Sequence, residues 1–124
     1  MEFKALGKRV SQPSRDLESF PTPPNTSLVR FTSNEITSLC PITKQPDFNT
    51  ITIEYCPDKL CLESKSLKLY LWSFREEAQF VEQLASQIAS DINKAISPKQ
   101  IAVTLAQNIR GGLQLTTVSR INNE

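Results

Sequence analysis

The sequence predicts an α+β domain in which a four-stranded antiparallel sheet carries two helices on one face. Two observations lead to this expectation. Apolar and polar side chains alternate in segments before and after the middle of the chain, which is typical of half-buried strands. Between these segments, apolar residues recur at steps of three and four, which is typical of amphipathic helices. The expected order is ββααββ, and two hairpins of this kind can join into one sheet with both helices on a single face.

The first two strands are expected at 27–32 and 49–55. The second is the clearer, since its apolar and polar residues alternate throughout; the apolar members are Ile51, Ile53 and Tyr55. A Pro57-Asp58 turn follows. Residues 61–64 then form a short strand or an extended approach to a helix.

The helices are expected at 66–74 and 76–96, and Ser97-Pro98 ends the second one. Two further strands, at 101–105 and 113–117, close the domain. Between them lies Arg110-Gly111-Gly112, where glycine can supply the positive φ of a tight turn. Residues 27–120 thus form one domain, 1–26 form a polar, proline-rich arm that is extended or mobile, and 121–124 form a frayed tail.

This arrangement leaves one face of the sheet and both of its edges uncovered. Sheet edges in natural proteins are paired, blunted or closed into a barrel. We therefore expect a homo-oligomer in which several copies close their sheets into a ring-shaped β-barrel, with functional sites at the subunit interfaces.

Composition excludes several classes of function. The chain has 124 residues, a net charge of +1, three cysteines and no histidine. The charge gives no basic field for direct nucleic-acid binding, and no segment reaches the roughly 20 apolar residues of a membrane helix. Without an export signal, an odd number of cysteines predicts free thiols in the cytoplasm. Without histidine, imidazole-based triads and His-containing zinc sites are excluded, and no metal site is expected.

One segment, 31–48, has the composition of a functional loop between two strands. It contains the thiol of Cys40, two prolines, and the carboxyl group of Asp47 seven positions after the thiol. A thiolate is a strong nucleophile, but a free cysteine is mostly protonated at neutral pH and needs a nearby proton acceptor. Asp47 could supply that function, although a buried, inert cysteine is the more common outcome for such a pattern.

Three motifs together resemble the NADPH-dependent 7-cyano-7-deazaguanine reductases. They are Leu39-Cys40-Pro41, Gln45-Pro46-Asp47-Phe48, and the lysine-rich run from Leu62 to Leu71. The likeness extends over about 17–112. It implies the tunnelling fold, which GTP cyclohydrolase I and pyruvoyl-tetrahydropterin synthase share, and this agrees with the order of elements predicted from periodicity.

The resemblance also implies a reaction. Cys40 adds to the nitrile carbon of the deazapurine substrate as a covalent thioimide, Asp47 donates the proton, and two NADPH reduce the carbon to give 7-aminomethyl-7-deazaguanine for queuosine, a tRNA modification. The substrate-binding residues implied are Leu62, Glu63, Ser64, Val81 and Glu82. Charge adds Lys65, Ser66 and Lys68 as cofactor-binding candidates.

The chain departs from the family pattern in one stretch. Where the family has Asn-His-Gly and then Phe-His-Glu, this chain has Glu76-Glu77-Ala78 and Phe80-Val81-Glu82, so Val81 stands at the position of a histidine. Two alternatives therefore stay open. One is an archaeosine-type amidinotransferase, in which ammonia attacks the same thioimide, and the other is a non-catalytic ring that binds a purine or pterin. Cys56 and Cys61 are expected to pack in a hairpin.

Overall fold

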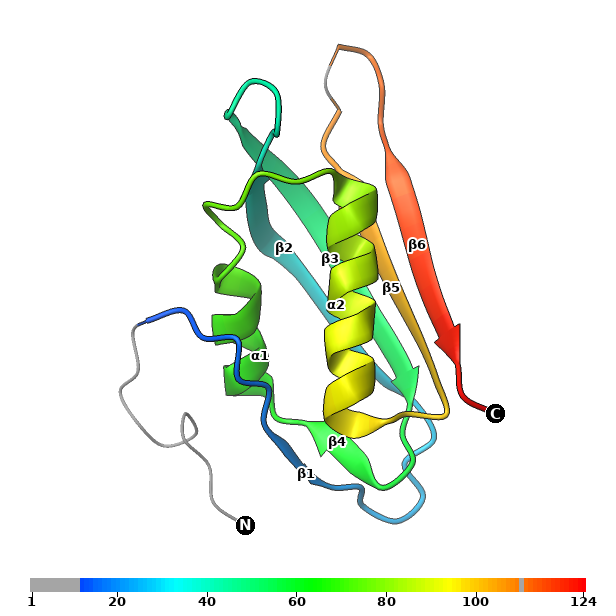
Figure 1. The fold of residues 1–124 in the computed structure, drawn as a ribbon. Helices are drawn as coiled ribbons and strands as arrows, with labels where there is room; N and C mark the ends of the chain where they lie inside the picture. Colours follow the sequence, from blue (N-terminus) through cyan, green and yellow to red (C-terminus); the bar gives the residue numbers. More distant parts are fainter. Residues whose placement is uncertain (1–11, 110) are drawn as a thin grey trace.

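Four long strands form one antiparallel sheet in the computed structural model, which describes residues 12–109 and 111–124 (Figure 1). Their order across the sheet is β2-β3-β5-β6. The bounds are β2 Val29–Leu39, β3 Pro46–Cys56, β5 Gln100–Gln107 and β6 Thr116–Asn122. The predicted four-stranded antiparallel sheet is confirmed.

Both helices lie on the same face of this sheet, as predicted (Figure 1). Helix α1 (Ser64–Trp72) contacts β2, and helix α2 (Val81–Ile96) packs on β5 and β6. The apolar stripe of α2 is fully buried against the strands, because its spacing of four residues keeps Leu84, Ile88 and Ile92 on one side. None of the described helices combines the length and apolar character that crossing a membrane requires.

The second helix begins later than predicted. Phe80 is its N-cap residue, so residues 76–79, which were expected to be helical, form a turn and an extended segment instead. The backbone of this segment pairs with the end of β2, where Leu39 N–H donates to the Glu77 carbonyl at 2.9 Å. A tertiary hydrogen bond has thus replaced the first helical turn.

Part of the N-terminal arm is ordered on its own chain. Strand β1 (Ser19–Pro21) pairs antiparallel with β4 (Leu60–Leu62) to form a second, two-stranded sheet. The arm expected over 1–26 thus contains a short extended strand that pairs within the chain, and residues 1–11 of it lie outside the described residues. Strand β4 confirms the short strand expected after the Pro57-Asp58 turn.

Two other boundaries differ from the predictions. The final strand was expected at 113–117, but β6 runs from Thr116 to Asn122, and the expected tail at 121–124 begins inside it. Ile121 pairs with Ile101 and packs against the core, whereas Leu113 is 78% exposed. Gly111 and Gly112 have φ values of 58° and 81°, as the turn required; Arg110 lies outside the described residues.

Candidate active site

Cys40 stands at the tip of the β2–β3 hairpin. Its N–H donates to the carbonyl of Gln45 at 2.8 Å, and its carbonyl accepts from the N–H of Lys44 at 2.9 Å. Lys44 closes this turn with a φ of 61°. The loop predicted over 31–48 is therefore wrong: β2 and β3 extend over most of it, and only six residues, 40–45, connect them. A regular hairpin fixes the two candidate residues far more firmly than a loop would.

The Cys40 thiol is half-buried, and its surroundings favour the thiolate form. Its pKa is lowered from the ordinary value chiefly because the Thr43 hydroxyl donates a hydrogen bond to the sulfur, with smaller contributions from the backbone N–H groups of Thr43 and Ile42. Burial and the negative charge of Asp47 act in the opposite direction. Since the thiolate is the nucleophilic form, this environment favours reactivity.

Asp47 lies in β3 and is only 4% exposed. It pairs directly with Ser38, and the next pair toward the turn is Leu39 with Pro46. Cys40, two residues beyond Ser38, is therefore the diagonal neighbour of Asp47, on the helix-facing side of the hairpin. Such diagonal neighbours lie about 7–8 Å apart. The hairpin brings the predicted thiol and carboxyl group together.

The segment before α2 forms one wall beside this pair. Leu39 and Ala78 form a parallel bridge, and Gln79 N–H donates to the Leu39 carbonyl at 3.2 Å. Arg15 holds the segment from outside: its guanidinium forms an ion pair with Glu77 and lies 3.8 Å from the Phe74 ring centre. This wall brings the start of α2 to the Cys40 end of the sheet.

The predicted substrate-binding residues divide between the two ends of the domain. Val81 and Glu82 begin α2 at the Cys40 end; Val81 is buried in the core and Glu82 is exposed. Leu62, Glu63 and Ser64 lie at the opposite end, between β4 and α1.

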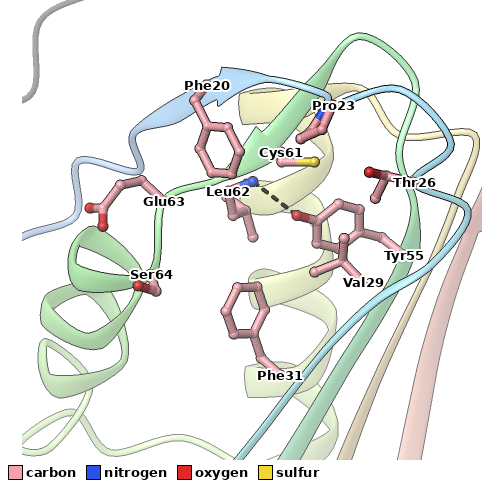
Figure 2. A pocket seen from close by; sticks show the side chains of 10 residues that line it. All are labelled: Phe20, Pro23, Thr26, Val29, Phe31, Tyr55, Cys61, Leu62, Glu63 and Ser64. Atoms are coloured by element: carbon pink, nitrogen blue, oxygen red, sulfur yellow. Dashed lines mark hydrogen bonds between the residues drawn. The ribbon is translucent and has the colours of Figure 1, made fainter.

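Leu62, Glu63 and Ser64 line a cavity of about 600 Å³ at that opposite end (Figure 2). Its walls are mostly apolar and aromatic, and the other lining residues are Phe20, Pro23, Thr26, Val29, Phe31, Tyr55 and Cys61. The phenol oxygen of Tyr55 accepts a hydrogen bond from Leu62 N–H at 2.9 Å, and burial raises the pKa of this phenol to about 12.

Glu63 has a structural function within this chain. Its carboxylate accepts hydrogen bonds from the N–H groups of Lys65 at 2.7 Å and Ser66 at 2.8 Å, and so caps the N-terminus of α1. This cap explains why a glutamate is only 4% exposed at the cavity wall.

One copy of the chain does not bring this cavity to Cys40. Asp47 and Tyr55 lie eight residues apart on the same strand, which corresponds to roughly 26 Å at about 3.3 Å per residue. The residues at these two ends can share a ligand only if a second copy brings its cavity to the hairpin of the first.

The three cofactor-binding candidates differ in their exposure and surroundings. Ser66 is 1% exposed, and its hydroxyl donates to the Glu63 carbonyl and accepts from Glu18 N–H, so it already has two partners within the chain. Its assignment to the cofactor stays a prediction. Lys65 is half-buried. Lys68 lines a groove of about 890 Å³ beside α1 and β2, together with Arg75 and Trp72, which sequence reasoning missed. Within the described residues, no group of three or more His, Cys, Asp or Glu side chains could hold a metal ion.

Sequence reasoning also missed three polar residues near Asp47. They are Ser38, Asn49 and Gln79. For Asn49 a signal was present, because residues 47 and 49 are in phase with Ile51, Ile53 and Tyr55 and therefore face the core. A polar residue at a core-facing position of a strand is therefore a candidate functional residue, as a cysteine is.

Comparisons with known proteins agree on one family. Residues 46–124 match the family described as "QueF-like protein". An NADPH-dependent 7-cyano-7-deazaguanine reductase from Alkalilimnicola ehrlichii is 46% identical over 88% of this chain and 86% of its own length. A protein of the same name from Frankia casuarinae is 44% identical over 100% of this chain and 99% of its own length.

A solved structure supports the fold. The apo form of an archaeosine synthase described as QueF-Like superposes with a TM-score of 0.72 at 28% sequence identity. The superposition covers 76% of this chain and 92% of that one.

Proposed function

The chain belongs to the QueF-like protein family, and we propose that it is an NADPH-dependent reductase that converts the nitrile of 7-cyano-7-deazaguanine to an aminomethyl group in queuosine biosynthesis. One observation carries the chemistry: the thiol of lowered pKa at Cys40 lies diagonally across the hairpin from the buried Asp47 carboxyl group. We expect the enzyme to act in the cytoplasm, where thiols stay reduced.

In the proposed first step, the Cys40 sulfur adds to the nitrile carbon. A carbon–sulfur bond forms, one π bond of the C≡N group breaks, and its electron pair moves to nitrogen. Asp47 takes the proton from the thiol and passes it to that nitrogen, so the product is a neutral thioimide. Covalent attachment converts a poor hydride acceptor into a more reactive C=N group held in a fixed position.

NADPH supplies the two hydrides of the reduction when it is bound. The groove beside α1 suits its phosphate groups, because it presents the cationic side chains of Lys68 and Arg75 and the ring of Trp72. We propose that Lys68 and Arg75 bind the cofactor phosphates, with Lys65 nearby on α1. Asp47, protonated again from solvent, supplies one proton to the substrate nitrogen for each hydride. Between the two hydride transfers the carbon–sulfur bond breaks, its electron pair and one proton return to the Cys40 sulfur, and the free thiol is regenerated.

We further propose that the complete site forms between two copies of the chain. The mostly apolar cavity suits a flat bicyclic base, but in one copy it lies at the far end of the sheet from Cys40. β2 and β6 are the outer strands of the sheet, and within the described residues their outer edges pair with no further strand, apart from the bridge between Leu39 and Ala78 at the end of β2. Pairing β2 of one copy with β6 of the next would close a ring and bring a neighbour's cavity toward the hairpin.

Mixing two inactive variants tests the shared site. Cys40→Ala removes the nucleophile, and Ser64→Trp fills the cavity at an exposed position that the fold tolerates. Co-expressed, the two should recover about one quarter of wild-type activity, because random mixing joins an intact hairpin to an intact cavity at that frequency. Steady-state turnover of the purified mixture measures it.

The matched control combines Cys40→Ala with Asp47→Asn. Both changes lie on the same hairpin, so no interface contains an intact pair and no activity should return. Absence of recovery in the first mixture, with both chains folded, would contradict the shared site.

The reaction itself is tested with the purified protein, 7-cyano-7-deazaguanine and NADPH. We expect two NADPH to be oxidised per nitrile, which absorbance at the nicotinamide band measures. When NADPH is left out, we expect a covalent adduct, which the mass of the protein reveals. Because the fold is similar to that of an archaeosine synthase, the specific alternative is an amidinotransferase. Adduct formation without NADPH oxidation, with ammonia consumed, would favour the amidinotransferase.

A further inference from the structure

Three buried polar atoms near the hairpin tip have no hydrogen-bond partner within the described residues. They are Ser38 Oγ, Asn49 Oδ1 and Gln79 Nε2. A fourth such atom, Thr37 Oγ1, belongs to the opposite face of β2, since successive strand residues alternate. Unsatisfied polar atoms in a folded interior are rare and call for a specific explanation.

Two of these side chains lie beside the Cys40–Asp47 pair, and the third lies one position deeper. Ser38 is 0% exposed and directly opposite Asp47. The parallel bridge between Leu39 and Ala78 places Gln79 beside Cys40, one residue further along each strand. Asn49, 2% exposed, follows Asp47 on the same face but pairs with Ile36, further from Cys40. Ser38 and Gln79 therefore place unpaired hydrogen-bonding groups next to the reacting sulfur.

The neighbouring positions show that this polarity is local. Ile36 pairs with Asn49, and Ile51 follows it along β3; both isoleucines are 1% exposed and belong to the apolar core. An apolar side chain at residue 38 or 49 would continue that core without leaving a buried polar group unpaired, which costs folding free energy. Groups kept unpaired here are explained by a ligand that pairs with them.

We propose that Ser38 and Gln79 form a polar recess that binds the reacting cyano group throughout its reduction. This inference rests on the proposed reductase function. A nitrile nitrogen only accepts hydrogen bonds, whereas the aminomethyl nitrogen of the product donates them. The recess offers both kinds of partner, because Gln79 Nε2 donates and the Ser38 hydroxyl donates or accepts.

Ser38→Ala and Gln79→Met test the recess, and Gln83→Met is the matched control, since Gln83 is exposed on the first turn of α2. In both test variants, thioimide formation without NADPH, measured by the mass of the protein, should slow about 10²- to 10³-fold, in line with the loss of one donor to developing charge. Alkylation of Cys40 by iodoacetamide should stay within about twofold of wild type, because the turn around the thiol is unchanged. Gln83→Met should match wild type in both rates.

Thermal unfolding separates a binding function from a structural one. Removing the unpaired Ser38 hydroxyl should leave Tm unchanged or raise it, because no hydrogen bond is lost. A lowered Tm with a parallel change in alkylation would overturn the proposal, as would adduct rates within about twofold of wild type. If the wild-type protein forms no adduct, both the proposed function and the proposed recess are wrong. If the wild-type protein and the variants form the adduct at the same rate, only the recess is wrong.

Discussion

Replacing Cys40 by alanine should abolish both nitrile reduction and the substrate-dependent mass increase of the protein. Turnover should fall by a factor on the order of 10³ or more, because no other group can form the thioimide and a free nitrile is a poor hydride acceptor. The fold should be unaffected, since the side chain is half-buried and the two backbone hydrogen bonds that close the turn, between Cys40 and residues 44 and 45, stay in place. Steady-state NADPH oxidation and intact-protein mass measure the two effects.

Cys56→Ala is the matched control. Cys56 is also a half-buried free thiol on the same hairpin, but it lies at the far end of β3, where it pairs with Gln100. We expect its turnover to stay within about twofold of wild type, because alanine there removes no group used in the reaction. Residual nitrile reduction by the Cys40→Ala protein would show that the covalent mechanism is wrong.

The regular elements could be predicted because their burial is one-sided. The alternation of Ile51, Ile53 and Tyr55 and the four-residue steps of α2 each produce one apolar face, which the sequence displays directly. The ordered arm and the late start of α2 could not, since both depend on backbone hydrogen bonds to distant segments. Ser14 N–H donates to the Leu69 carbonyl, and Leu39 N–H donates to the Glu77 carbonyl.

The candidate site was predictable only in part. The seven-residue spacing of Cys40 and Asp47 places them diagonally because only six residues, 40–45, connect the strands, a length the sequence did not reveal. The burial of Ser66 could not be predicted, because its charge-rich surroundings conceal that it lies on the buried side of α1. Ser64 and Cys40 lie at opposite ends of the domain, and the local sequence pattern does not display that separation because it depends on the length of the strands between them.

Asp47→Asn should stop nitrile reduction without making the Cys40 thiol less reactive. The amide has nearly the same shape as the carboxyl group but can neither accept the thiol proton nor pass it to the substrate nitrogen. Loss of such a general acid–base group costs about 10²- to 10⁴-fold in turnover. Asp58→Asn is the matched control, since Asp58 is exposed in the turn after β3, and its turnover should equal that of wild type.

The thiol should respond in the opposite direction. The negative charge of Asp47 raises the pKa of Cys40, so replacing it with a neutral amide should lower that pKa further and increase the thiolate fraction at neutral pH. Alkylation of Cys40 should therefore be as fast as in wild type or faster, and its pH profile should move to lower pH. Slow alkylation together with slow turnover would mean that Asp47 supports the hairpin instead of transferring a proton. Faster alkylation with lost turnover would show two effects of the Asp47 carboxyl group. It disfavours the Cys40 thiolate, and it is still required for turnover because the substrate nitrogen must receive a proton from it.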